Sequence, residues 1–279
     1  MFYDSGCPPD ACGFKGSGGN TQPINGYDRA NLAQTYSALL SLLILDDDIS
    51  RVDRKAILEA IRLSQRENGC FWSQGNGSES DMRFVFCAVA VCHIFNDFSP
   101  INWKTLRSFI RSSMTYDGGI GQGENAEAHG GSTFCAIAAL SLSGRLWDES
   151  ILTQAELTRL IKWAILKQEI GFHGRTGKPD DTCYAFWIGA TLKILNAYHL
   201  CASSSVRQFL LSTQHNHMGG FSKLCEDGAY PDMLHTYFSL AALSLQGEPT
   251  LRSLHPALNI SERVYGKLGR ISQVDSLVL

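Results

Sequence analysis

The sequence from Gly171 to Trp187, GFHGRTGKPDDTCYAFW, joins a cation-rich turn to the start of an apolar helix. Pro179 disfavours helix at and just before its own position, so we expect the helix to begin near Asp181, a good N-cap residue. Inside a regular helix, Asp181 and Cys183 would point about 200° apart. With Asp181 at the helix mouth, both side chains can face one point. A carboxylate and a thiolate there would suit a metal that takes a third ligand from elsewhere. The alternative is a simple cap beside a small buried residue.

Turns that contain Gly and an apolar residue recur along the chain, each about ten residues before an apolar helix. The helix starts at Asp81, His129, Asp181 and His235 lie 48, 52 and 54 residues apart. A period near 50 fits a repeat made of a helix pair and a structured loop. The turns are CGF at Cys12, NGCF at Asn68, DGGI at Asp117, IGF at Ile170 and MGGF at Met218.

Two kinds of helix alternate in the sequence. Nearly uniform apolar segments start at Thr35, Met82, Ser132, Asp181 and Leu234. Between them lie amphipathic segments, with charged residues on one face, that start at Asp53, Asn102, Thr153 and Ser204. An all-apolar helix is buried, whereas an amphipathic helix keeps one wet face. The pattern predicts an all-α fold with buried inner helices and solvated outer helices, and it contains no convincing strand.

This arrangement would bring the N-termini of the inner helices, with their partial positive charges, to one mouth. A positive mouth above aromatic walls suits a ligand with an anionic head, such as diphosphate, and a long apolar tail. The alternative is that the cations are solvated loop residues and the aromatic rings are ordinary core. The mouth residues would be Arg83, His129, Arg175, Lys178, Tyr184, Lys223 and His235, and the walls Phe84, Phe86, Phe134, Phe186, Trp187, Tyr237 and Phe238.

Composition narrows the class of protein. The formal charge of −3 over 279 residues argues against a dedicated nucleic-acid or anionic-membrane binder. The sequence contains no run of about 18 apolar residues, so it predicts no membrane span. The first residues lack the pattern of a secretory signal. The nine cysteines are an odd number without regular spacing, which does not suggest a disulfide framework. We therefore expect a reduced, soluble, cytoplasmic protein.

Several motifs resemble those of one family, the β subunits of protein prenyltransferases, and most closely the type I geranylgeranyltransferase β subunit. The resemblance covers the chain from about Cys12 to about Glu262. It rests on DMRFVFCA at Asp81, HGGSTFC at His129, FHGRTGKPDDTCYAFW at Phe172, ATLKIL at Ala190, GGFSK at Gly219 and PDMLHTYF at Pro231.

The resemblance implies an α/α toroid of inner and outer helices that occupies residues 1–279 as a single domain. Residues from about 263 to 279 would form a flexible C-terminal tail. Compared with the family, the chain looks shortened before Cys12 by up to about two helix pairs. We therefore expect a toroid that is incomplete at its N-terminal side.

Carried over by motif, the resemblance implies one zinc ion held by Asp181, Cys183 and His235. The fourth position would be left for the cysteine of a protein substrate, and an open position is typical of catalytic zinc. Lys223 would help catalysis by offsetting diphosphate charge in place of magnesium, so we expect no magnesium requirement.

The resemblance also implies a set of substrate-binding residues. Arg83 matches a residue near the C-terminal carboxylate of the bound peptide, although a salt bridge with Asp81 is the alternative. Phe238 matches an aromatic residue of the isoprenoid pocket, and we place Trp187 in the same wall. The residues that match diphosphate contacts are His129, Arg175, Lys178 and Tyr184.

The implied function is transfer of geranylgeranyl from geranylgeranyl diphosphate to the cysteine of a C-terminal CaaX motif in which X is Leu. The expected partners are a prenyltransferase α subunit, in a heterodimer, and CaaX proteins such as small GTPases. Two alternatives remain at this level. One is a farnesyltransferase β subunit, and the other is a truncated, non-catalytic form that only pairs with the α subunit.

Overall fold

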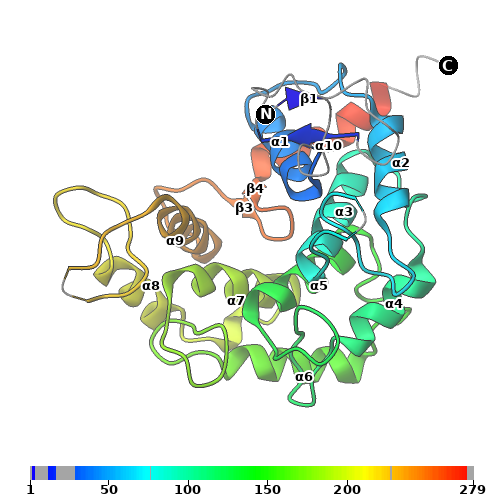
Figure 1. Cartoon of the computed structure of the whole chain (residues 1–279). Coiled ribbons are helices and arrows are strands. Elements are labelled where there is room, and N and C mark those ends of the chain that lie inside the picture. Colours follow the sequence, from blue (N-terminus) through cyan, green and yellow to red (C-terminus); the bar gives the residue numbers. More distant parts are fainter. Residues whose placement is uncertain (1, 4–11, 17–28, 76, 227, 275–279) are drawn as a thin grey trace. The chain divides into compact units, whose positions relative to one another are not determined.

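Helices dominate the computed structural model, which describes residues 2–3, 12–16, 29–75, 77–226 and 228–274 (Figure 1). The helices are α1 (Leu32–Ile44), α2 (Arg54–Ser64), α3 (Met82–Ile94), α4 (Trp103–Ser112), α5 (Gly130–Leu142), α6 (Gln154–Ile165), α7 (Thr182–Ile194), η2 (Tyr198–Leu200), α8 (Ser203–Ser212), α9 (Met233–Gln246) and α10 (Glu262–Val274). The apolar and amphipathic segments of the sequence correspond to alternate helices from α1 to α9. The all-α prediction is therefore confirmed.

The N-caps of the apolar helices set the repeat. They are Asn31, Asp81, His129, Asp181 and Asp232, at intervals of 50, 48, 52 and 51 residues. In each case the side chain accepts a hydrogen bond from a backbone N–H two or three residues further on, which satisfies one of the free donors of the first turn. Helix α9 starts before His235, because Asp232 and not His235 is its N-cap.

One compact unit consists of Met1–Ser112 together with Arg263–Leu279. Within it, α1 packs against α3, which is buried on nearly every side. Helices α2 and α4 are each buried on their apolar face only. The segment that we expected to be a tail begins with α10, whose Arg263 lies 3.2 Å from Asp46 and whose Lys267 also pairs with Asp46.

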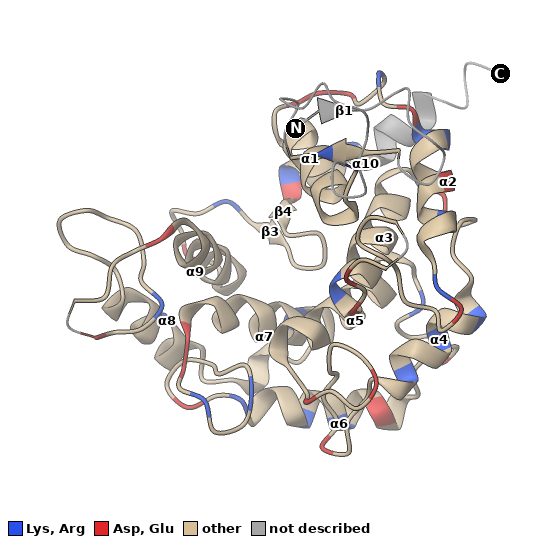
Figure 2. Ribbon diagram, in the orientation of Figure 1, with Lys and Arg blue, Asp and Glu red and all other residues tan. Residues whose placement is uncertain are grey.

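The second unit runs from Ser113 to Glu262. Here α7 packs against α5 on one side and α9 on the other, and it also contacts α6 and α8 (Figure 1). Charged residues lie on α6 and in the loops, while α5, α7 and α9 are almost free of them (Figure 2). The inner helix α9 has an exposed apolar face, with Met233 90% exposed and Leu234 53% exposed.

The Gly turns join one repeat to the next. The four turns from Asn68 onward each close with an isolated β-bridge, of which Gln65–Phe71 and Gln214–Phe221 are two. The backbone of Gly69 has φ +95°, and an added Cβ would lie 2.1 Å from the carbonyl oxygen of Thr105 in the next amphipathic helix. Glycine is needed there because the turn must both adopt a left-handed conformation and approach α4 closely.

The starts of the inner helices are tied to the loop of the following repeat. The backbone N–H of Gly130 donates to the carbonyl of Gly174 at 2.9 Å, and that of Thr182 donates to the carbonyl of Lys223 at 3.1 Å. These bonds use two further donors of the first helical turn. They fix the loops that precede α7 and α9 against the N-termini of α5 and α7.

Short strands depart from the expectation of a strand-free chain. Phe2–Tyr3 (β1) pairs with Phe14–Lys15 (β2), and Leu254–His255 (β3) pairs with Ile260–Ser261 (β4), both antiparallel. Each strand has two residues, too few for a period-two pattern to appear in the sequence. No helix in the described ranges is both long and apolar enough to cross a lipid bilayer.

Candidate metal centre

Asp181 lies where the sequence predicts, as the N-cap of α7. Its Oδ1 accepts a hydrogen bond from the backbone N–H of Cys183 at 2.9 Å, and its own N–H donates to the carbonyl of Phe172 at 3.0 Å. The side chain is 7% exposed. A buried carboxylate needs compensating partners, so the position favours a cation nearby.

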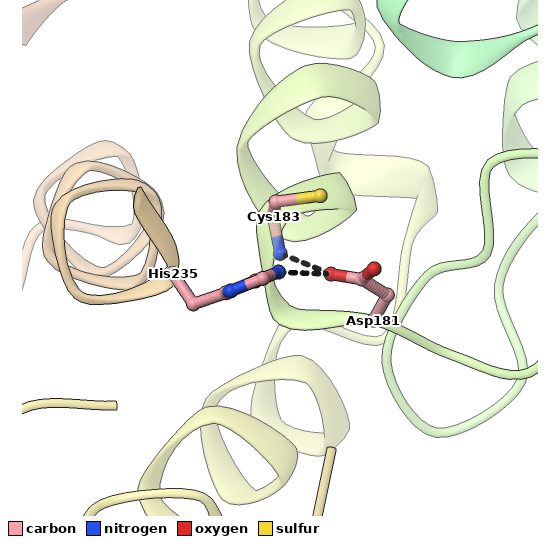
Figure 3. A group of neighbouring side chains, drawn as sticks. All are labelled: Asp181, Cys183 and His235. Carbon is pink, nitrogen blue, oxygen red and sulfur yellow. Dashed lines mark hydrogen bonds and ion pairs between the residues drawn. The ribbon is translucent and has the colours of Figure 1, made fainter. Parts of the chain in front are cut away.

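His235 reaches Asp181 from the first turn of α9 (Figure 3). Its Nε2 lies 3.4 Å from Asp181 Oδ1, and one ligand atom of each of Asp181, Cys183 and His235 lies within 4.8 Å of the others. Carboxylate oxygen, thiolate sulfur and imidazole nitrogen are the donors that zinc takes in proteins. The donor set therefore fits the zinc ion that the sequence resemblance implies.

Asp232 completes the geometry of His235, and the sequence analysis did not assign it a role. Its Oδ1 accepts the backbone N–H of His235 at 2.8 Å, and its Oδ2 lies 2.6 Å from His235 Nδ1. A proton on Nδ1 bonds this carboxylate and leaves the lone pair of Nε2 directed at Asp181. The signal was present as an Asp three residues before a His at a helix start.

Cys183 is buried beside the carboxylate. Burial raises the pKa of its thiol well above the usual range, and the charge of Asp181 raises that pKa further. A thiolate at this position would therefore require a strong neighbouring cation, which a bound metal supplies.

Lys223 lies next to the same carboxylate. Its Nζ is 3.7 Å from Asp181 Oδ2, and its side chain is 58% exposed. The loop that carries it is held at α7, because Thr182 Oγ1 donates to the carbonyl of Ser222 at 2.9 Å. The structure thus places the predicted Lys223 at the edge of the candidate metal centre.

His129 and Tyr184 form a hydrogen-bonded pair between α5 and α7. The Nδ1 of His129 accepts the backbone N–H of Gly131 at 3.1 Å, so its Nε2 carries the proton and donates to Tyr184 Oη at 2.8 Å. The hydroxyl hydrogen of Tyr184 is then available to another acceptor. Burial lowers the pKa of His129 and raises that of Tyr184 to about 12, which keeps both groups neutral.

The cations of the preceding turn are more exposed. Arg175 Nη1 lies 3.8 Å from Glu127 Oε2, and Lys178 lies exposed three residues after Arg175. Asp180 holds the base of this loop, because its Oδ2 accepts the N–H groups of Ile170 and Gly171 at 3.0 and 2.7 Å. Asp180 therefore anchors the loop, while the next residue, Asp181, belongs to the candidate metal centre.

Arg83 belongs to the other compact unit. It forms an ion pair with Asp81, the N-cap of its own helix, at 2.6 Å and another with Glu79 at 2.7 Å. This is the alternative that the sequence left open for Arg83.

An aromatic cluster joins α5, α7 and α9. Trp187 packs against Phe238 with ring centroids 4.4 Å apart, and Phe134 lies 5.1 Å from Trp187. Phe186 contacts Phe134, Trp187 and Phe238 at 5.2 to 5.3 Å. The structure therefore groups the predicted wall residues of this unit, with Trp187 and Phe238 partly exposed.

Comparisons with known proteins agree with this architecture. Residues 3–260 match the prenyltransferase alpha-alpha toroid domain. The chain is 43% identical over 242 residues to the geranylgeranyl transferase type-1 subunit beta of Dictyostelium discoideum, covering 86% of this chain and 67% of that protein. It is 38% identical over 260 residues to the protein of the same name from Arabidopsis thaliana, covering 89% and 68%.

A solved structure is similar over most of the chain. It is Candida albicans protein geranylgeranyltransferase-I complexed with GGPP, with a TM-score of 0.79, 27% identity, and coverage of 89% of this chain and 76% of that one. The toroid architecture and the named relatives lead to the same assignment. The chain belongs to the prenyltransferase alpha-alpha toroid family, among the β subunits of the protein prenyltransferases.

Proposed function

We propose that the chain is the catalytic β subunit of a type I protein geranylgeranyltransferase. The observation that carries the proposal is the Asp181, Cys183 and His235 donor set beside Lys223, in a chain whose relatives carry that name. The proposed substrates are geranylgeranyl diphosphate and a protein that ends in CaaX with Leu as X, such as a small GTPase. The proposed partner is a prenyltransferase α subunit.

In the proposed reaction, the sulfur of the substrate cysteine bonds to C1 of the isoprenoid as the C1–O bond breaks. The electron pair of that bond leaves with the diphosphate. Asp181, Cys183 and His235 would hold a zinc ion, which would favour the nucleophilic thiolate of the substrate cysteine, with the thiol proton released to solvent. Asp232 holds the proton of His235 at Nδ1, which directs Nε2 to the metal position.

The residues around the centre stabilise the leaving group. Tyr184 can donate its hydroxyl hydrogen to a diphosphate oxygen, because His129 already occupies its lone pair. Arg175, Lys178 and Lys223 supply positive charge where negative charge grows on the leaving oxygen. With Lys223 in this role, the reaction proceeds without magnesium.

The aromatic cluster supplies the apolar part of the site. Trp187 and Phe238 are partly exposed, so their rings can line the isoprenoid chain. Arg83 would bind the carboxylate of the CaaX peptide after exchanging its present partners. We further propose that residues 1–279 act as one toroid domain in the cytoplasm.

The test is to co-express the chain with a prenyltransferase α subunit and to measure bound zinc and geranylgeranyl transfer to a peptide ending in CaaL. We expect about one zinc per chain and transfer that persists without magnesium. Asp181→Asn keeps a good cap but should lose zinc and transfer together, and His235→Ala should behave likewise. The matched control is Asp148→Asn, which changes an exposed carboxylate in the same unit.

Other outcomes decide between the candidates. Preference for farnesyl diphosphate over geranylgeranyl diphosphate would favour the farnesyltransferase alternative. Zinc and a stable complex without transfer of either lipid would favour a non-catalytic subunit. Zinc retained at full level in both ligand variants would reject the assigned metal centre.

A further inference from the structure

A cavity lies beside α6, and none of the residues assigned above lines it, although Thr176 in its lining directly follows Arg175. Its volume is about 570 Å³, it is open to solvent, and the loops that carry Tyr116 and Thr176 contribute to its lining. Pockets of this size hold ligands larger than a single small ion. Its other lining residues are Asp117, Arg159, Lys162, Trp163, Leu166, Lys167 and His173.

Lys167 is the unusual member of this lining, because it is only 5% exposed. Its Nζ donates to Thr176 Oγ1 at 2.6 Å and lies 5.1 Å from the centroid of the Trp163 ring. In the described part of the chain, no carboxylate oxygen forms an ion pair with this ammonium group. The Thr176 hydroxyl takes one of the three N–H donors, which leaves two for the face of the Trp163 ring and for another acceptor.

A buried ammonium group without a counter-charge is unfavourable. The one lining carboxylate, Asp117, already accepts the indole N–H of Trp163 at 3.1 Å and the hydroxyl of Thr115. His173 is paired instead with Asp180, at 3.3 Å. The cavity therefore presents a positive centre that the surrounding side chains do not neutralise.

The rest of the lining indicates what would fill the cavity. Arg159 and Lys162 are exposed on α6 and add two positive charges at the rim. Tyr116 is 97% exposed and Leu166 is 66% exposed, so the rim also offers apolar surface. A free phosphate would occupy only a small part of this volume and would gain nothing from its apolar surface.

We propose that this cavity binds an acidic segment of a partner protein, with a carboxylate or phosphate group of the segment on the ammonium of Lys167. An apolar side chain of the segment packs on Tyr116 and Leu166, and the rim cations bind its further charges. Charge-assisted hydrogen bonds to a desolvated ammonium give the site its selectivity for oxyanions.

The experiment measures binding of a fluorescent peptide, acetyl-Glu-Glu-Leu-Glu-Glu-amide, to the full-length chain by anisotropy. We expect saturable binding that weakens at least about tenfold in Lys167→Met. The analogue with Gln at every Glu should bind at least as poorly. The matched control is Lys193→Met, which removes another lysine packed on an aromatic ring, 4.5 Å from the centroid of Tyr198.

A second variant guards against a folding defect. Lys162 is exposed, so Lys162→Met leaves the core intact and should weaken the peptide about threefold, as expected for one rim charge. Equal binding of the Glu and Gln peptides, or unchanged affinity in both lysine variants, would overturn the proposal. Inorganic phosphate is tested as a competitor. If it binds with the same dependence on Lys167 while the peptide does not bind, the occupant is a free oxyanion and the protein-segment proposal is wrong.

Discussion

The two histidines of the candidate active site hold their protons on different nitrogens. Asp232 Oδ2 lies 2.6 Å from His235 Nδ1 and favours the proton on that nitrogen, so that Nε2, 3.4 Å from Asp181 Oδ1, can face a metal. His129 uses Nδ1 as an acceptor for backbone N–H groups, so its Nε2 carries the proton toward Tyr184. A single neighbouring acceptor or donor thus decides whether a histidine serves as a ligand or as a donor.

Asp232→Asn tests this assignment at the metal. Asparagine caps a helix as well as aspartate does, so α9 should keep its start. The amide is a weaker acceptor for the Nδ1 proton, and we expect zinc affinity to fall about tenfold to a hundredfold. Competition with a chelator of known affinity measures the change, with Asp148→Asn as the control. Equal zinc affinity in the variant would show that Asp232 serves only as a cap.

Tyr184→Phe tests the donor. We expect the rate of geranylgeranyl transfer to fall about tenfold to a hundredfold, because one donor to the leaving diphosphate is removed. Bound zinc should change little, and the unfolding temperature should fall modestly, because the Nε2–H of His129 loses its acceptor. Steady-state kinetics should place the loss in kcat and leave the KM for the peptide unchanged. Tyr116→Phe, at an exposed tyrosine, is the control, and an equal loss in that variant would count against the role of Tyr184.

At the scale of the helix, the capping position determines what each repeat can do. Asp81 caps α3 and binds Arg83, His129 caps α5 and binds Tyr184, and Asp181 caps α7 and faces His235. In each case one side chain both satisfies the helix terminus and makes a second contact. The first turns of α3, α5 and α7 therefore hold the candidate site residues, while the following turns of these helices form the core.

The cap at His129 predicts a pH dependence of stability. Burial and the charge of Arg175 lower the pKa of His129 from its usual 6.5, so below that pH the unfolded chain binds a proton that the folded chain does not. The free energy of unfolding should therefore fall as pH drops below about 6.5. Urea unfolding at pH 7.5 and pH 5.5 should show a smaller fall in His129→Asn, which retains a capping side chain. His199→Asn, on exposed η2, should match the original chain.

The Gly turns predict a difference between two glycines. Gly69→Ala should lower the free energy of unfolding by about 3 kcal/mol, because the new Cβ meets backbone atoms of α4 that cannot move away. Gly144 also has a positive φ, +72°, but no atom lies within 4 Å of an added Cβ. Gly144→Ala should therefore cost only about 1 kcal/mol, from backbone strain alone. Equal losses in chemical denaturation would show that close packing is not the reason for Gly69.

At the scale of the whole molecule, helix type and repeat period were readable from the sequence, because burial on all sides and burial on one face leave different patterns. Pro179 and the capping preference of aspartate located the start of α7, because Asp181 is its N-cap. The start of α9 was placed too late, at His235, because Asp232 was not recognised as its cap. The contact between Asp181 and His235 followed from resemblance alone, since no local pattern reports which residues meet across two repeats.

The cavity at Lys167 was missed for a related reason. A lysine near the end of an amphipathic helix is usually solvated, and its burial depends on loops that lie before α5 and before α7. The two-residue strands were missed because so short a pairing leaves no alternation in the sequence. The cavity depends on loops that lie apart in the chain, whereas the paired strands β3 and β4 and the contact between Asp232 and His235 are local.

Removal of the metal should lower the unfolding temperature of the chain. The ligands come from α7 and α9, so a bound zinc ion would link two inner helices of one unit. A metal at a hundred times its dissociation constant stabilises the folded state by about 2.7 kcal/mol. Scanning calorimetry should show a lower unfolding temperature after chelation, and its recovery when zinc is restored. Asp181→Asn should be insensitive to the chelator, and a similar drop in that variant would place the metal elsewhere.

The repeated cap also bears on how such a chain can change over generations. Asn31, Asp81, His129, Asp181 and Asp232 satisfy the same structural demand with three different residue types. Exchange among capping residues keeps the helix start intact, while it changes the side-chain group that faces a neighbouring residue. The capping positions of the repeats are therefore places at which a new ligand or donor can be introduced without loss of folding.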